Sequence, residues 1–238
     1  MTKGNILKKE KITGEILSKA VQEGSQALSE YESKRIVANA NVPVTREVLV
    51  HSREEAVSQA ARIGFPVVLK GSDPALTHKT EMGMVRVNLK NDQDVARAYD
   101  ELMGKGIHME GILIQEMVKG NREFVIGLTR DPQFGPCVMF GIGGIFTEAL
   151  KDVSFRVAPL TEEDAQEMIY EIKASRLLDA FRGESAVDEK VLVKALVGIG
   201  ELGMRYDDIA EIDINPLIIT EGKPVAVDAL VILKTNRA

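Results

Sequence analysis

The sequence of 238 residues lacks tryptophan and contains only one cysteine, Cys137. A single cysteine excludes an intrachain disulfide framework and is typical of a reducing cytosol, so we expect a cytoplasmic protein. Aromatic residues make up 5% of the chain and the net charge is −6, which argues against nucleic-acid binding because base-stacking surfaces and basic patches are scarce. No apolar stretch reaches the ~20 residues of a transmembrane helix, and the polar N-terminus lacks the apolar core of a secretory signal. We therefore expect no membrane partner.

Two common nucleotide-binding motifs are also absent, namely the phosphate loop GxxxxGK[ST] and the dinucleotide fingerprint GxGxxG. The chain is nevertheless 45% apolar and 28% charged, which suits a folded protein with a sizeable core. Helical and strand-like segments intermingle throughout, and this order predicts an α+β, or mixed α/β, fold. Strands are predicted over residues 42–50, 67–71, 84–89, 112–118, 123–129 and 137–141.

Capping residues followed by apolar positions at helical spacing predict four helices. These begin after Ser52, Asn91, Thr161 and Asp188. Residues 3–23 are predicted to form a further amphipathic helix within an N-terminal extension, residues 1–25. Gly104 and Gly106 allow a flexible backbone shortly before residue 110. We therefore expect a first lobe over residues 26–110 and a second over residues 111–238.

An alternating polar segment near the C-terminus is the strongest chemical signal. Alternation along a strand places Glu211, Asp213 and Asn215 on one face. A turn at residues 221–224 would bring a second predicted strand, residues 225–230 with its lone acid Asp228, beside the first. Oxygen ligands from one or two side chains, completed by phosphates and water, are typical of a Mg²⁺–nucleotide site. A solvated edge strand explains the same spacing.

Lys70 ends the apolar run 66–70, where a lysine can reach ligand phosphates as a point charge or extend its head group to solvent. Further on, Glu116 and Glu123 flank a glycine-containing connection. Such a connection can act as a hinge whose backbone reads an adenine edge and whose far carboxylate holds ribose hydroxyls. Solvated glutamates beside a turn are the alternative.

Two further segments have phosphate chemistry as one interpretation. The amides of Gly143 and Gly144 can form an anion-binding nest, although glycines there can also mark a simple bend. His78 lies in a polar loop directly before Lys79, and a neutral imidazole can accept a phosphoryl group as a nucleophile. A structural histidine is the alternative.

The order of these features resembles the ATP-grasp fold, in which two lobes clamp a nucleotide. The runs 140–160 (FGIGGIFTEALKDVSFRVAPL) and 211–230 (EIDINPLIITEGKPVAVDAL), with the segment 28–34, closely resemble the β subunit of ADP-forming acetyl-CoA synthetases. The resemblance covers about residues 26–235. Succinyl-CoA synthetase β subunits are more distantly similar. The family usually has two glycines after the histidine loop, whereas here Gly83 is followed by Met84.

The resemblance implies roles for the candidate residues. His78 would be phosphorylated transiently. The phosphates of the nucleotide would contact Lys70, and its adenine would contact Glu116, Met117 and Val118. The ribose would contact Glu123. The phosphate end of the site would be lined by Gly143, Gly144 and Glu148. Mg²⁺ would be held by Asn215 and Asp228, with Asp213 in support.

The resemblance also implies a partner and a reaction, that of an ADP-forming acetate–CoA ligase. A separate CoA-binding α subunit, in an α₂β₂ heterotetramer, would pass phosphate from an acyl phosphate through its own histidine to His78 and then to ADP. Acetate, branched-chain and aryl acids remain open as substrates. Two other hypotheses are a self-contained ATP-grasp carboxylate ligase and a non-catalytic nucleotide-sensing module. The presence of Lys70, His78, Asn215 and Asp228 counts against the sensing module.

Overall fold

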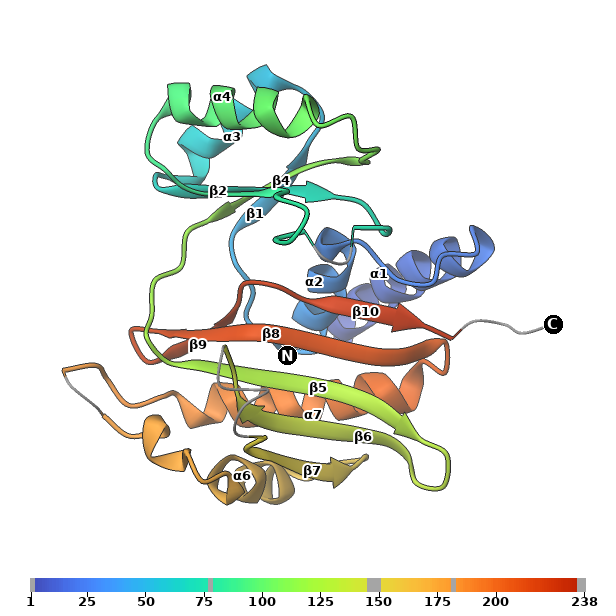
Figure 1. The fold of residues 1–238 in the computed structure, drawn as a ribbon. Helices are drawn as coiled ribbons and strands as arrows, with labels where there is room; N and C mark the ends of the chain where they lie inside the picture. The colour runs from blue at the N-terminus through green and yellow to red at the C-terminus, as the bar shows by residue number, and fades with distance from the viewer. Residues whose placement is uncertain (1–2, 77–78, 145–150, 181–182, 235–238) are drawn as a thin grey trace.

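Two antiparallel sheets, each with its own helices, form the two lobes of the protein (Figure 1). The computed structural model describes residues 3–76, 79–144, 151–180 and 183–234. Helices and strands alternate along the chain and the strands form two separate sheets, which confirms the predicted α+β fold with two lobes. Within the described ranges, no helix is both long and apolar enough to cross a bilayer.

The small lobe is a four-stranded sheet with two helices over one face (Figure 1). Its strands, in spatial order, are β1 (Glu47–Val50), β4 (Gly111–Glu116), β2 (Val67–Ser72) and β3 (Val85–Leu89). The helices are α3 (Arg53–Ile63) and α4 (Asp92–Met103). Both begin where the capping residues predict: Ser52 Oγ and Asn91 Oδ1 accept hydrogen bonds from backbone amides three residues on, at 3.1 and 2.9 Å.

The large lobe contains most of the core. Its strands, in spatial order, are β10 (Leu230–Leu233), β8 (Ile209–Thr220), β5 (Glu123–Asp131), β6 (Gly135–Ile142) and β7 (Val153–Val157), with β9 (Lys223–Ala226) also paired to β8. Its helical segments are α6 (Glu162–Glu171), a 3₁₀ turn (Ser175–Leu178) and α7 (Glu189–Arg205). Phe124 and Phe140 stack in this core with their ring centroids 5.3 Å apart.

Two N-terminal helices pack on the large lobe beside β10 (Figure 1). Helix α1 (Lys3–Gln22) matches the predicted amphipathic segment and buries Ile16 and Leu17. Helix α2 (Glu30–Asn39) was not predicted, and it buries Ile36 and Val37 in the same core. The backbone amide of Val231 in β10 donates to Ser33 Oγ of α2 at 3.1 Å, which ties the helix to the sheet edge.

The sheet pairing places the boundary between the lobes later in the chain than the expected position between residues 110 and 111. Strand β4 pairs with both β1 and β2, so it is an inner strand of the small sheet, and α2 belongs to the core of the large lobe. The run Ile112, Leu113 and Ile114 is fully buried, as an inner strand covered on both faces requires. The chain therefore crosses from the small to the large sheet after Glu116, not before Gly111.

Two strands also differ from prediction, and β7 was not predicted. The strand expected over residues 42–50 begins only at Glu47, because Val44 forms just an isolated bridge to Ala226. The strand expected over residues 225–230 is divided into β9 and β10, which pair with different halves of β8. The residues between them, including Asp228, therefore lie in a short link beside β8.

Candidate functional site

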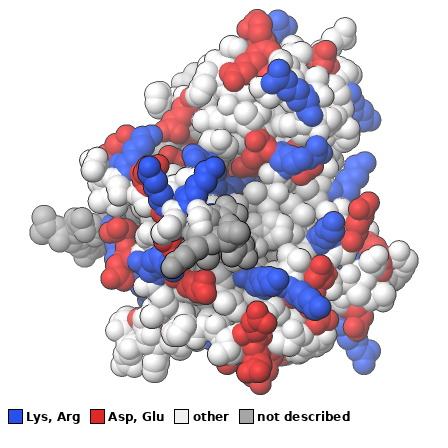
Figure 2. Space-filling view, turned by 180° about the vertical axis from the view of Figure 1, so that it is seen from behind, with Lys and Arg blue, Asp and Glu red and all other residues white. Residues whose placement is uncertain are grey.

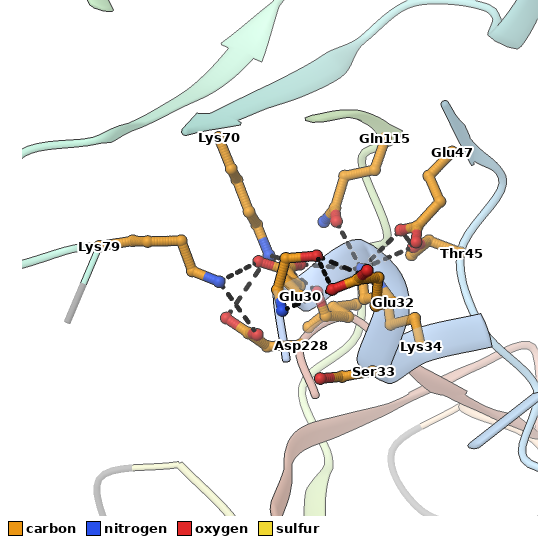
Figure 3. Close-up of polar contacts among 12 residues, drawn as sticks. Glu30, Glu32, Ser33, Lys34, Thr45, Glu47, Lys70, Lys79, Gln115 and Asp228 are labelled. Carbon is orange, nitrogen blue, oxygen red and sulfur yellow. Dashed lines mark hydrogen bonds and ion pairs between the residues drawn. The ribbon is translucent and has the colours of Figure 1, made fainter. Parts of the chain in front are cut away.

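A group of buried charged side chains lies where the two lobes meet (Figure 3). Glu30 comes from the first turn of α2 in the large lobe, and Lys70 comes from β2 of the small sheet. Lys70 Nζ lies 2.7 Å from Glu30 Oε1 and donates to the carbonyl oxygen of Val227 at 2.8 Å. Lys70 is 6% exposed. Its ammonium group is thus buried and paired between the lobes instead of extending into solvent.

Lys34 connects the same carboxylate to the far side of the group. Its side chain is fully buried, with Nζ 3.0 Å from Glu30 Oε1 and 2.7 Å from Glu47 Oε2. It also donates to Gln115 Oε1 at 2.7 Å and to Thr45 Oγ1 at 3.1 Å. Because Glu47 and Gln115 belong to the small sheet and Glu30 and Lys34 to α2, these contacts bridge the two lobes.

Lys79 and Asp228 complete the group on the solvent side. Lys79 Nζ bonds Glu30 Oε2, the oxygen that Lys70 does not use, and lies 3.7 Å from Asp228 Oδ1. Lys70 Nζ lies 3.7 Å from the other oxygen of Asp228. The Asp228 side chain is 36% exposed, whereas that of Glu30 is 1% exposed. One wall of the site is therefore the buried carboxylate of Glu30 with its three lysines, and Asp228 is the accessible acid beside it.

The pKa values follow from burial and neighbouring charge. Burial would raise the pKa of Glu30, but the positive charges of three lysines outweigh this effect and hold it well below 4.5. Burial would lower the pKa of Lys70, but Glu30 and Asp228 keep it above its ordinary value. Glu47 behaves differently, because burial raises its pKa and the charge of Lys34 offsets only part of that rise. Glu30 and Lys70 therefore remain ionised at neutral pH.

Strand β8 shows the predicted alternation. Ile212 and Ile214 are buried, whereas Glu211 is exposed and Asp213 and Asn215 are half-buried on the other face. The strand register places Leu230, two residues after Asp228, opposite Asp213. The three predicted metal residues thus come from one strand and the link beside it.

The surroundings of Asp213 disfavour the ionised form of its carboxyl group. Burial, together with the negative charges of Glu211 and Asp228, raises the pKa of Asp213 to about 6. Within the described ranges there is no cluster of three or more His, Cys, Asp or Glu side chains that could hold a metal. Two carboxylates and one amide fit a Mg²⁺ ion that takes its remaining ligands from phosphates and water, not a cage made by protein alone.

The raised pKa of Asp213 gives a testable pH dependence. Without Mg²⁺, the folded chain takes up a proton on Asp213 near pH 6, whereas the unfolded chain does so only near 3.8. We therefore expect wild type to gain stability relative to Asp213→Asn as the pH is lowered from 7 to 5. Excess Mg²⁺ should suppress this gain by keeping the carboxylate ionised. Urea unfolding of both proteins at the two pH values checks the prediction, and a pH-independent difference would contradict it.

The connection between the lobes lies where the two hinge glutamates predicted it. Glu116 ends β4, and its carboxylate accepts from Arg46, through the backbone amide at 2.8 Å and through Nε at 2.7 Å. The Met117 amide donates to the carbonyl oxygen of Pro66 at 3.2 Å, and Val118 is half-buried. Glu123 begins β5. The Glu116 carboxylate is therefore engaged by Arg46, whereas the backbone groups and the half-buried side chains of Met117 and Val118 can still contact a ligand.

The described part of the glycine turn lies against Glu123. The Gly143 amide donates to the Glu123 carbonyl oxygen at 2.8 Å. Gly144 has φ +67°, and a Cβ at this position would lie 2.5 Å from Glu123 Oε2. A side chain at Gly144 would therefore displace the carboxylate. Two other predicted residues, His78 and Glu148, lie outside the described residues.

The face seen from behind carries acidic and basic side chains interspersed with one another (Figure 2). This mixture agrees with a sequence of 30 basic and 36 acidic residues.

Comparison with known proteins decides the family. A model described as the ATP-grasp domain matches residues 19–233. The chain is also 44% identical over 225 residues to subunit beta of ADP-forming acetate–CoA ligase I from Pyrococcus furiosus, with 92% of this chain and 97% of that protein covered. The chain belongs to the ATP-grasp β-subunit family of ADP-forming acetyl-CoA synthetases. The predicted family, and with it the nucleotide-binding part of an ADP-forming acyl-CoA ligase, is confirmed.

Two further relatives of this ATP-grasp β subunit are informative. ADP-forming acetate–CoA ligase I of Archaeoglobus fulgidus is 35% identical over 92% of this chain, and the match covers 33% of that longer protein. The acetyl-CoA synthetase 1 of Ca. Korarchaeum cryptofilum was solved with coenzyme A and Mg-AMPPCP, its phosphohistidine segment pointing towards the nucleotide-binding site. It superposes with a TM-score of 0.84 at 45% identity, covering 93% of this chain and 100% of that one.

Sequence reasoning missed the centre of this ATP-grasp site. Glu30 and Lys34 were not selected, nor were the small-sheet partners Glu47 and Gln115. A local signal was present, because Ser29-x-x-Glu32 is a capping box that the structure forms. With that helix start recognised, Glu30 and Lys34 form an acid–base pair four residues apart on a helix.

Proposed function

We propose that this chain, the nucleotide-binding β subunit of an ADP-forming acyl-CoA ligase, transfers a phosphoryl group between His78 and ADP. One observation supports this most directly. Lys79, the residue after His78, lies 3.7 Å from Asp228, the accessible acid of the predicted metal site. Lys79 and the metal candidate Asp228 therefore lie close together, beside Lys70.

The described geometry suggests how the nucleotide would lie. Adenine would contact backbone groups of Glu116, Met117 and Val118, because the Glu116 carboxylate is engaged by Arg46. The ribose hydroxyls would bond Glu123. The phosphates would extend past the glycine turn, with Gly143, Gly144 and Glu148, towards the buried charge group. This arrangement spans both lobes, as a nucleotide clamp requires.

The phosphate end would be neutralised by protein and metal together. Lys70 supplies a permanent positive charge between the lobes, since its pKa is raised. Asp213, Asn215 and Asp228 would hold Mg²⁺, which when bound would neutralise phosphate charge and orient the nucleotide. Positioning and charge neutralisation are the main contributions a protein can make to phosphoryl transfer.

The proposed step is a transfer between two nucleophiles. An oxygen of the ADP β-phosphate attacks phosphorus on phosphorylated His78, so a P–O bond forms while the P–N bond breaks, and ATP and neutral imidazole result. In the full cycle, acyl-CoA and phosphate would first give CoA and an acyl phosphate on the α subunit. An α-subunit histidine would then attack the phosphorus of the acyl phosphate, so that a P–N bond forms, the P–O bond to the acyl group breaks and the acid is released. His78 would next attack this phosphohistidine, so that a new P–N bond forms on His78 while the α-subunit P–N bond breaks.

The partner follows from the relatives. One relative is named a β subunit, which implies a separate α subunit, and another is a single chain about three times as long as the matched part. We propose that a CoA-binding α subunit supplies the remainder, in an α₂β₂ assembly. Acetate is the favoured acid, because acetate–CoA ligases are among the most similar proteins.

Labelling with γ-labelled ATP and Mg²⁺ tests the proposal. Wild type should acquire an acid-labile, base-stable label that ADP discharges, whereas His78→Ala should acquire none. His108→Ala, at an exposed histidine, is the matched control and should label like wild type. If wild type binds nucleotide but takes no label on His78, even with the α subunit added, the relay is wrong. A self-contained ligase would then be the better hypothesis.

A further inference from the structure

Glu30 is a buried carboxylate that pairs with three lysines, Lys34 and Lys70 at Oε1 and Lys79 at Oε2 (Figure 3). Oε1 lies 2.7 Å from Lys70 Nζ, and Oε2 bonds Lys79 Nζ. Lys70 is fixed within β2, whereas Lys79 directly follows His78 in the chain. One side chain of α2 thus links the phosphate-side lysine to the neighbour of the candidate nucleophile.

Specific contacts of the side chain and the backbone hold Lys79 in place. Its side chain is only 11% exposed, although the residue lies in a polar stretch outside any strand or helix. A buried ammonium group needs a charged partner, because its desolvation is otherwise unfavourable. Glu30 provides that partner, and the Met84 amide fixes the Lys79 backbone by donating to its carbonyl oxygen at 2.7 Å.

We propose that Glu30 and Lys79 form a positioning pair for phosphoryl transfer. The pair ties the residue next to His78 to the carboxylate that also holds Lys70. Consecutive Cα atoms are about 3.8 Å apart, so an anchored Lys79 limits the distance over which His78 can stray from the phosphate end. The inference rests on the proposed function and adds two residues to it.

The same pair has a second consequence through Asp228. Lys79 Nζ lies 3.7 Å from Asp228 Oδ1, so its positive charge competes with any cation that this acid binds. Removing the ammonium group should therefore have opposite effects on two quantities. Mg²⁺ should bind Asp228 more readily, whereas His78 should lose its anchor and react more slowly.

The test measures labelling of His78 by γ-labelled ATP in the full chain assembled with its α subunit. In Lys79→Met, we expect the maximal labelling rate to fall roughly ten- to a hundredfold, the effect of misplacing a reacting group. The Mg²⁺ concentration for half-maximal rate should fall about two- to fivefold, as expected for losing one partly exposed ion pair. ADP affinity, measured by calorimetry, should change by less than about twofold. Lys79→Arg should recover part of the rate.

Two further variants separate positioning from structural damage. Lys90→Met makes the same substitution at an exposed lysine outside the group and should behave as wild type. Glu30→Gln should slow labelling at least as much as Lys79→Met, because Glu30 also holds Lys70. The double variant Glu30→Gln/Lys79→Met should be no slower than Glu30→Gln alone, because Lys79 acts through its contact with Glu30. If Glu30→Gln fails to fold, Lys79→Met alone tests the positioning role, because in that variant Glu30 keeps Lys34 and Lys70 as partners.

The outcomes distinguish this inference from the proposed function. Normal labelling of Lys79→Met alongside a labelled wild type overturns the positioning pair and leaves the proposed function standing. A slower rate with unchanged Mg²⁺ dependence, or with an equal loss of ADP affinity, indicates general damage and also overturns it. If wild type itself takes no label on His78, both proposals are wrong.

Discussion

Replacing Lys34 by methionine is expected to lower the free energy of unfolding by about 3–5 kcal/mol, the usual effect of removing one partner from a buried ion pair. Lys34 is fully buried and lies within 3.0 Å of Glu30 and 2.7 Å of Glu47. Without it, Glu47 loses its ion-pair partner, and Gln115 and Thr45 lose their donor. The side chains remaining on both sides of the lobe junction are then buried and poorly satisfied.

Urea unfolding of wild type and Lys34→Met at pH 7 measures the loss of unfolding free energy at a pH where Glu30 is ionised. The pKa of Glu30 is held below its ordinary value of 4.5, so the stabilisation from its ion pairs is complete at pH 7 and is lost only in strong acid. The matched control is Lys194→Met, an exposed lysine on α7, which should change stability by less than about 0.5 kcal/mol. Lys34→Met/Glu47→Gln should recover part of the loss, because it removes the acid left unpaired. A loss below about 1 kcal/mol would contradict the prediction.

The ion group shows which parts of a site can be predicted from one sequence. Alternation along β8 placed Asp213 and Asn215 on a common face, and the apolar run before Lys70 placed that lysine on a buried strand, although β2 continues past Lys70 to Ser72. Both are local consequences of strand geometry. In contrast, Lys34 meets Gln115 across 81 positions of the chain. Periodicity indicates that a side chain is buried but not which distant residue it meets.

The link containing Asp228 illustrates a second limit. Apolar residues from 225 to 230 predicted one continuous strand with Asp228 inside it. The structure divides this segment because β9 and β10 pair with different halves of β8. Leaving the ladder frees the Val227 carbonyl for Lys70 and turns Asp228 towards the lysines. A lone acid in an apolar run was therefore a sign of an interrupted strand, and the interruption forms the site.

Lys70→Met is expected to lower the rate of His78 phosphorylation by about 10²–10³, the usual loss when a preorganised group that stabilises transition-state charge is removed. The reason is position as well as charge. Lys70 is held on a buried strand by Glu30 at 2.7 Å and by the Val227 carbonyl at 2.8 Å, so its ammonium needs little reorganisation when phosphate arrives. The substitution leaves Glu30 paired with Lys34 and Lys79, and the fold should survive.

The pattern of effects separates Lys70 from Lys79. Lys70→Met should weaken ADP binding as well as slow labelling, because this lysine is expected to contact the phosphates, whereas Lys79→Met should leave ADP affinity nearly unchanged. Lys70→Arg keeps the charge but not the shape, so we expect only partial activity. Calorimetry with ADP and labelling with γ-labelled ATP measure both quantities, with circular dichroism to verify folding. A folded Lys70→Met chain that binds ADP and labels His78 like wild type would show that the phosphate site lies elsewhere, and Lys70 would then be only a structural tie between the lobes.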